Sequence, residues 1–248
     1  MISCKDITKN FGEFHAVSHA SFLVPRGSIC ALLGPNGAGK STVVKILTGL
    51  LRATSGSVEI CGTRSDDPAL KRIIGILPES LALFDALTVA EHLDLTGAAY
   101  KLEPAVIRER TDQLLRVLRL EHGRSTFIHQ CSYGMRKKTA LAMALLPNPR
   151  ALFLDEPFEG IDPVTAETIR MQLRSIARRG ITVLLTSHIL SLVDRVADKV
   201  VMINRGRIVF DANTNELPDT LENLYFEMVE RAEGEELAWL GPEASQAS

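Results

Sequence analysis

Long hydrophobic runs are missing from this chain of 248 residues. The longest unbroken apolar segment, 140–146, has seven residues, whereas a helix that crosses a membrane needs about 20. The first residues, Met-Ile-Ser-Cys-Lys-Asp, lack the apolar stretch of a secretory signal peptide. We therefore expect a chain that neither crosses a membrane nor is exported.

Aromatic residues and cysteine pairs are also scarce. Aromatics make up 5% of the chain, with the single tryptophan at position 239, so the core must be mainly aliphatic. The cysteines, Cys4, Cys30, Cys61 and Cys131, form no C-x-x-C pair and no group with zinc-ligand spacing. This pattern excludes a disulfide scaffold and favours reduced, mostly buried thiols in a cytosolic protein.

Neither sign of charge dominates overall. The formal net charge is −2, which argues against a general nucleic-acid-binding protein. Locally, residues 101–150 carry ten basic and four acidic side chains, and 211–248 carry one basic and ten acidic. The basic segment is either a solvated surface or a face turned toward a membrane or an acidic partner. With 46% apolar residues, the chain can form one large folded domain or two small ones.

Short apolar runs alternate with segments of helical periodicity, which predicts an α/β fold with a mainly parallel sheet. Helices are expected after residue 39, within 88–146, over 164–179 and over 217–229. The helical stretch 88–146 has the character of an insertion on the sheet. The predicted strands are 2–8, 20–24, 28–33, 57–61, 73–77, 151–154 and 181–186, with a hairpin of 199–203 and 207–210.

A glycine-rich segment between a predicted strand and a predicted helix fits the pattern G-x-x-x-x-G-K-[ST]. Its glycines let the backbone N–H groups turn toward phosphate oxygens, and the helix that follows adds the positive end of its dipole. Its lysine can reach the β- and γ-phosphates of a nucleotide, and its serine can bind Mg²⁺. The alternative, a simple tight turn, does not explain that context. The segment is Gly34, Pro35, Asn36, Gly37, Ala38, Gly39, Lys40, Ser41 and Thr42.

Two adjacent carboxylates, Asp155 and Glu156, follow the apolar run 151–154. Ligands of parallel sheets bind at the carboxyl ends of the strands. Asp155 is therefore a candidate Mg²⁺ ligand, and Glu156 a candidate general base that polarises water for attack on the γ-phosphate.

Together these motifs resemble the ATP-binding subunit of ABC transporters, over about residues 1–230 and in the order of that family. The closest similarity is to single-domain ATPases of exporters for drugs, ions or polymers. The resemblance implies a P-loop NTPase core with an N-terminal antiparallel β subdomain and a helical subdomain inserted at about 80–147. Residues 231–248 are left as an acidic C-terminal tail, which we expect to be mobile.

Further positions match that family one by one. Phe11 resembles the aromatic residue that stacks on adenine, although it could be an ordinary strand-end aromatic. Ser132 and Gly134 match the serine and second glycine of the family signature, which bind the γ-phosphate held by the other subunit. The signature departs from the family pattern at Cys131, Tyr133 and Met135.

Three more residues carry expected roles. Asp162 resembles the central acid of the loop that couples the two subunits, and a helix N-cap before Pro163 is a compatible alternative. His188 resembles the switch histidine that contacts the γ-phosphate, although a lone histidine is usually structural. Glu79 stands where the family usually has a glutamine that binds Mg²⁺ and senses the membrane partner.

The resemblance implies an ATPase that pairs with a second ATP-binding subunit around two ATP molecules and drives a separate membrane-spanning permease. It would lie on the cytoplasmic face of the membrane, with residues 79–135 as the candidate docking surface. The main alternative is a soluble ABC-type ATPase that powers macromolecular assembly; another P-loop enzyme or a non-hydrolysing module explains fewer motifs. The cargo, its direction, the permease and the choice of homodimer or heterodimer stay open.

Overall fold

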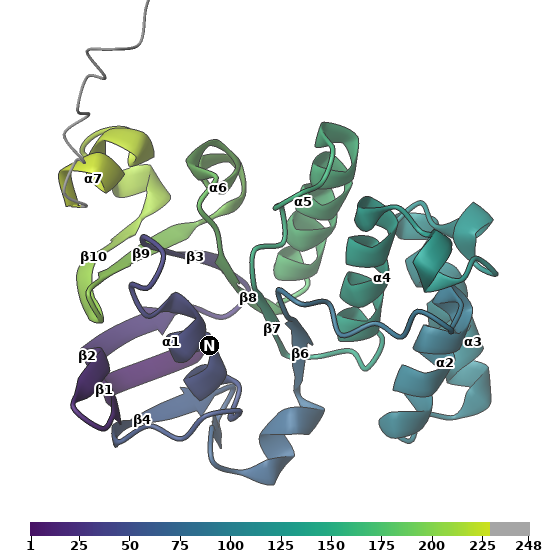
Figure 1. The fold of residues 1–248 in the computed structure, drawn as a ribbon, viewed down its shortest axis with the longest axis horizontal. Coiled ribbons are helices and arrows are strands. Elements are labelled where there is room, and N and C mark those ends of the chain that lie inside the picture. The colour runs from purple at the N-terminus through teal and green to yellow at the C-terminus, as the bar shows by residue number, and fades with distance from the viewer. Residues whose placement is uncertain (229–248) are drawn as a thin grey trace, which may run out of the picture.

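The computed structural model describes residues 1–228, which form two sheets with helices packed on and between them (Figure 1). The antiparallel sheet has the order β2-β1-β4-β5 and is built from β1 (Ile2–Phe11), β2 (Phe14–Val24), β4 (Ser55–Ile60) and β5 (Thr63–Arg64). It confirms the expected N-terminal antiparallel subdomain. Strands β1 and β2 are longer than predicted and meet in a tight hairpin at Gly12, whose positive φ suits glycine.

The second sheet has six strands in the order β10-β9-β3-β8-β7-β6. Strands β9, β3, β8, β7 and β6 run parallel, and β10 pairs antiparallel with β9 at the edge, as the predicted hairpin requires. The sheet confirms the mainly parallel α/β fold. Its strands are β3 (Ile29–Leu33), β6 (Ile74–Leu77), β7 (Ala151–Leu154), β8 (Thr182–Thr186), β9 (Lys199–Asn204) and β10 (Arg207–Asn213).

Both faces of the parallel sheet are buried, so its central strands are mainly apolar, with Thr182 and Thr186 at the two ends of β8 as buried polar residues. On β3, Cys30 and Leu32 face a core shared with helix α1 (Lys40–Leu47) and the antiparallel sheet. Ile29, Ala31 and Leu33 face a second core shared with helices on the opposite side. This alternation on one strand holds the two layers together and fixes where its carboxyl end emerges.

The remaining helices are α2 (Val89–Ala99), α3 (Pro104–Val117), α4 (Tyr133–Leu145), α5 (Pro163–Arg178), α6 (Leu190–Val196) and α7 (Leu221–Met228). Helices α2, α3 and α4 fall inside the predicted insertion and gather at the end of the molecule away from the antiparallel sheet (Figure 1). In the part of the chain that the structure describes, no helix combines the length and apolar character needed to cross a membrane.

Two predictions about helices need correction. Helix α6 was not predicted, because its seven residues are too few to show a clear period. The C-terminal helix begins at Leu221 rather than at 217, because Leu217 precedes Pro218 and has extended backbone. Thr220 accepts a hydrogen bond from the Asn223 N–H at the start of the helix. The predicted end at 229 and the acidic tail 231–248 lie outside the described residues.

Part of the basic segment 101–150 differs from both expectations, because several of its basic side chains face neither solvent nor a membrane or partner. Lys137 and Lys138 are buried, with 0% and 9% of their surface exposed. The Arg110 guanidinium donates to the carbonyl oxygen of Leu146, and that of Arg136 donates to the carbonyl oxygens of Ile128 and Cys131. At these positions the charge serves to satisfy backbone carbonyls inside the fold.

Helix α2 begins with a capping box. The Thr88 hydroxyl accepts from the Glu91 N–H, and the Glu91 carboxylate accepts from the Thr88 N–H at 2.7 Å. We predict that Thr88→Ala lowers the free energy of unfolding by about 1 kcal/mol in urea denaturation, because the Glu91 N–H loses its acceptor and the Glu91 carboxylate loses the Thr88 hydroxyl. Thr88→Ser keeps the oxygen and should unfold close to wild type. Equal loss in both variants would contradict the capping explanation.

Candidate active site

The glycine-rich segment 34–39 joins β3 to α1 and lies against the end of β9. A Cβ atom on Gly34 would lie 2.2 Å from the carbonyl oxygen of Ile203, so no other residue fits there without a backbone shift. Gly39 precedes α1 with a φ of 108°, a conformation that side chains rarely adopt. These two glycines allow the loop to close tightly over the amino end of α1, where the N–H groups of the first turn are available to an anion.

The Lys40 side chain folds back over this loop. Its Nζ atom donates to the carbonyl oxygen of Gly34 at 2.7 Å and to that of Pro35 at 3.1 Å. Burial lowers the pKa of Lys40, while the carboxylates of Glu156, Asp155 and Glu79 oppose that shift. The ammonium therefore lies in one electrostatic environment with the three acids that the sequence analysis proposed.

Asp155 and Glu156, which follow β7, are both bound by Thr186, the last residue of the neighbouring strand β8. The Thr186 hydroxyl donates to Asp155 Oδ1 at 2.6 Å and accepts from the Glu156 N–H at 3.0 Å. Glu156 itself has a φ of 47°, which is unusual for a residue with a side chain. The chain thus turns sharply at the carboxyl edge of the sheet.

The Glu156 carboxylate lies beside His188, which follows β8. Glu156 Oε2 is 3.1 Å from His188 Nδ1, and the Glu156 side chain is only 12% exposed. The contact lacks hydrogen-bond geometry, and this buried oxygen has no hydrogen-bond partner among residues 1–228. It is a buried acceptor with a free lone pair, which is what a general base for a water molecule requires.

These groups line one pocket of about 390 Å³. The pocket brings together nine of the residues proposed from the sequence: Gly34, Pro35, Asn36, Lys40, Ser41, Glu79, Asp155, Glu156 and His188. It also contains two that sequence reasoning missed. Glu159 lies three residues after Glu156 in the same loop, so its position was a usable signal. Tyr225 comes from α7, and nothing local to the C-terminal helix indicates that it reaches this pocket.

Burial, together with the Glu156 charge, raises the pKa of Tyr225, so its hydroxyl stays a neutral donor and acceptor beside the carboxylate. The side chain is partly buried against the larger core. Helix α7 therefore closes one wall of the pocket.

The other proposed residues lie outside that pocket lining. Gly37, Ala38, Gly39 and Thr42 belong to the loop and to the first turn of α1. Phe11 ends β1, is 50% exposed, and has Lys9 Nζ 4.9 Å from its ring centroid.

Ser132 and Gly134 stand at the amino end of α4, away from the pocket. The Ser132 hydroxyl accepts from the Met135 N–H at 3.2 Å and so caps the helix. A Cβ on Gly134 would lie 3.1 Å from Thr165 Oγ1, next to Asp162. Asp162 in turn caps α5 by accepting from the Val164 and Thr165 N–H groups. It also accepts from the Thr165 hydroxyl, and the hydrogen bonds from this hydroxyl and from the two N–H groups lower the pKa of Asp162. The N-cap interpretation of Asp162 is confirmed.

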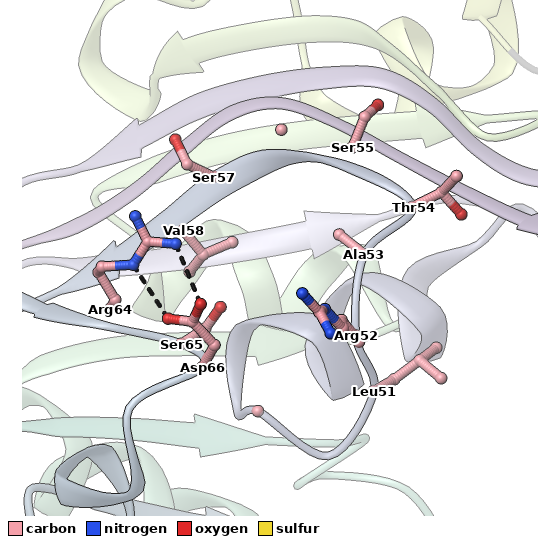
Figure 2. A pocket seen from close by; sticks show the side chains of 12 residues that line it. Leu51, Arg52, Ala53, Thr54, Ser55, Ser57, Val58, Arg64, Ser65 and Asp66 are labelled. Carbon is pink, nitrogen blue, oxygen red and sulfur yellow. Dashed lines mark hydrogen bonds and ion pairs between the residues drawn. The ribbon is translucent and has the colours of Figure 1, made fainter.

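A second hollow, of about 520 Å³, lies beside β4 (Figure 2). Arg64 and Asp66, two residues apart in its lining, form a paired contact at 3.0 Å on one side of the hollow (Figure 2). None of the residues proposed from the sequence lines it, so it is not the site of the predicted chemistry.

The donor set of the first pocket suits a hard divalent cation. Ser41 offers a hydroxyl, and Asp155 and Glu79 offer carboxylates, all oxygen ligands of the kind that Mg²⁺ prefers. Within residues 1–228 there is no group of three or more His, Cys, Asp or Glu side chains placed to hold a metal by itself. Such a set fits an ion that takes its remaining ligands from water and phosphate.

Comparison with known proteins gives a consistent result. The sequence profile of the ABC transporter family matches residues 17–159, more than half of the chain. The chain is 31% identical to the ABC-type transporter ATP-binding protein EcsA of Bacillus subtilis, over 95% of this chain and 99% of that protein. It is also 31% identical to the probable multidrug ABC transporter ATP-binding protein YbhF of Escherichia coli, over 92% of this chain. It spans only 42% of that relative's length.

A solved structure of the ATP-binding subunit of an ABC transporter superposes with a TM-score of 0.84 at 32% identity. The match covers 92% of this chain and 99% of that one. Sequence profile, full-length relative and fold therefore agree, and the chain belongs to the ABC transporter family as one of its ATP-binding members.

Proposed function

We propose that this chain binds ATP with Mg²⁺ and hydrolyses it, and that hydrolysis drives a membrane-spanning permease. The observation that carries the proposal is a single pocket in which a phosphate-binding loop, Lys40 and the pair Asp155–Glu156 converge. On this proposal the permease is a separate polypeptide, in line with the relatives named as ATP-binding proteins of ABC transporters.

Nucleotide binding follows from the loop and its lysine. The N–H groups at the start of α1 and the Lys40 ammonium face the pocket as donors for the β- and γ-phosphates. Ser41, Asp155 and Glu79 hold Mg²⁺, which neutralises charge on the phosphates. Phe11 stacks on the adenine from outside the phosphate pocket; its ring is half exposed, with Lys9 Nζ 4.9 Å from the ring centroid.

Hydrolysis is assigned to Glu156. Its buried carboxylate oxygen accepts a proton from the attacking water, and Thr186 and His188 keep the carboxylate beside the phosphate site. His188, 51% exposed at the pocket, contacts the γ-phosphate. Both roles use side chains already lining the same pocket.

The chain works with a second ATP-binding subunit. Ser132 caps α4 and Gly134 lies in its first turn, both outside their own chain's pocket, so on this proposal the phosphate that they bind belongs to the partner subunit. The partner is a second copy or a homologue. ATP held between the two closes the pair, and hydrolysis reopens it.

The permease docks in an apolar groove of about 470 Å³ between α2, α4 and the edge strand β6. Leu50, Leu95 and Tyr100 line it and are 65%, 47% and 38% exposed. A cytoplasmic segment of the permease that buries these side chains places the chain on the cytoplasmic face of the membrane. The docking surface thus overlaps residues 79–135 and extends beyond them. We propose export as the direction, in line with the multidrug transporter named for the Escherichia coli relative.

Lys40→Ala should abolish ATP binding, because the loop loses the cation that neutralises the phosphates. Titration with a fluorescent ATP analogue checks this, with Lys45→Ala on the same helix as the control that keeps binding. Unchanged affinity of Lys40→Ala would show that the loop is not the phosphate site.

Glu156→Gln should bind Mg-ATP normally and turn over at least about 10²-fold more slowly, as expected for loss of a general base. Phosphate release under saturating ATP is the measurement. Glu159→Gln changes a second carboxylate of the same pocket and should cost much less. Near wild-type turnover of Glu156→Gln would move the catalytic base to another residue.

Leu95→Asp should disrupt docking and leave ATP binding intact, because a charge replaces an apolar side chain in the groove. A tagged chain is recovered from native cells in mild detergent, with Val209→Asp on β10 as the control. Wild type and control should bring down a protein with several membrane spans, and Leu95→Asp should not. Recovery of wild type only in the soluble fraction, with assembly factors, would favour the soluble assembly ATPase.

A further inference from the structure

Helix α4 carries a fully buried lysine, Lys137, one turn after its amino end. Its Nζ atom donates to the carbonyl oxygen of Glu156 at 2.5 Å and to that of Glu159 at 3.2 Å. The same atom lies 5.2 Å from the centroid of the Tyr133 ring. The ammonium is therefore satisfied by two carbonyls and an aromatic face, all near the end of β7.

The surroundings of Lys137 are strongly acidic. Burial lowers its pKa, while the carboxylates of Glu159, Glu156, Glu79 and Asp155 oppose that shift, in decreasing order. All four acids line the candidate nucleotide pocket, but Lys137 itself does not. Lys137 contacts only the backbone of the loop that carries Glu156 and Glu159, on the side of the loop away from the pocket.

That loop needs support because part of its backbone is unfavourable. Glu156 has a φ of 47° and Gly160 a φ of 70°. A left-handed conformation is unfavourable for a residue with a side chain, so surrounding contacts must hold it. The Glu156 N–H is held by Thr186 on one side. On the other side, its carbonyl oxygen is held by Lys137.

Tyr133, one of the residues at which this chain departs from the family signature, supports the other end of the loop. Tyr133 occupies the position of the first signature glycine, and its ring packs on Gly160. A Cβ on Gly160 would lie only 2.9 Å from Tyr133 Cε1. The ring thus covers the loop end while its face meets the Lys137 ammonium. Tyr133 and Lys137 act together on residues 156–160.

We infer that Lys137 is a positioning residue for Glu156. By binding the carbonyl oxygens of Glu156 and Glu159, it fixes the backbone of the loop at Glu156. The Glu156 carboxylate is thereby held in an orientation toward the nucleotide. It also joins this loop to the helix whose amino end holds Ser132 and Gly134. The inference rests on the proposed ATPase function and adds to it a residue outside the pocket.

The test compares Lys137→Met, Lys137→Arg and the matched control Lys138→Met. Lys138 is the neighbouring buried lysine, and it binds the carbonyl oxygen of Arg119 rather than the loop. We expect Lys137→Met to lower kcat at least about tenfold with ATP affinity and KM unchanged, because a misplaced catalytic group slows chemistry without weakening binding. Lys138→Met should keep kcat within about twofold, and Lys137→Arg, which keeps the donors, should recover most of it.

A double-mutant cycle identifies Glu156 as the residue through which Lys137 acts. In a Glu156→Gln background, Lys137→Met should reduce the residual turnover by no more than about twofold, because the group that it positions is already inactive. A full further tenfold loss would show that Lys137 acts on something else and would overturn the inference.

Folding is checked by thermal unfolding and ATP binding before any rate is compared. If Lys137→Met does not fold, Lys137→Gln takes its place, because its polar amide is easier to accommodate than an apolar side chain. Its side chain is shorter than lysine and uncharged, so it should still lower kcat with KM unchanged. Normal kcat in a folded Lys137→Met or Lys137→Gln overturns the inference and leaves the ATPase function standing. If wild type shows no hydrolysis that depends on Glu156, the proposed function fails, and the positioning role fails with it.

Discussion

The hydroxyl of Thr186 is the contact on which the candidate site depends. Thr186 is the last residue of β8 and is fully buried, and its hydroxyl binds the Asp155 carboxylate and the Glu156 N–H at the same time. One side chain thus sets the orientation of the first carboxylate and the backbone turn that presents the second. A buried donor or acceptor left without its partner costs about 1–3 kcal/mol, so the two strands and both acids form one unit. The geometry of the pocket follows from strand pairing rather than from a flexible loop.

The phosphate side of the pocket is held just as firmly from the other direction. A side chain on Gly34 would collide with the carbonyl oxygen of Ile203, so the loop after β3 packs closely against the end of β9. Residues of β3 alternate between two cores, which prevents the strand from sliding or rotating. Lys40 can therefore fold over the loop with its charge already facing the three acids. Little rearrangement of the backbone is needed to receive a polyphosphate, and that lowers the cost of binding.

Motifs that follow strands directly could be predicted from the sequence, because parallel strands bring their carboxyl ends to one edge. That argument places Asp155 at the edge of the sheet, the glycine-rich motif identifies the loop containing Lys40, and the family resemblance adds His188. The structure has all three in one pocket. Tyr225 and Lys137 could not be found in this way, because their contacts depend on how α7 and α4 pack across the sheet. For Lys137, composition gives the wrong prediction. A basic segment suggests side chains exposed to solvent, whereas the Lys137 ammonium is buried and binds two backbone carbonyl oxygens.

Helix α4 contacts two different sites, and this bears on how nucleotide binding in one subunit would be coupled to hydrolysis in the other. Its first turn, with Ser132 and Gly134, is turned away from its own pocket, while Lys137 reaches inward to the Glu156 carbonyl. A ligand shifts a conformational equilibrium only by its different affinity for the two states. On our proposal, phosphate bound at the first turn of α4 favours one position of the helix, and Lys137 passes that preference to the loop carrying Glu156. Each subunit would then hydrolyse its own ATP efficiently only when its α4 has engaged the ATP of the other.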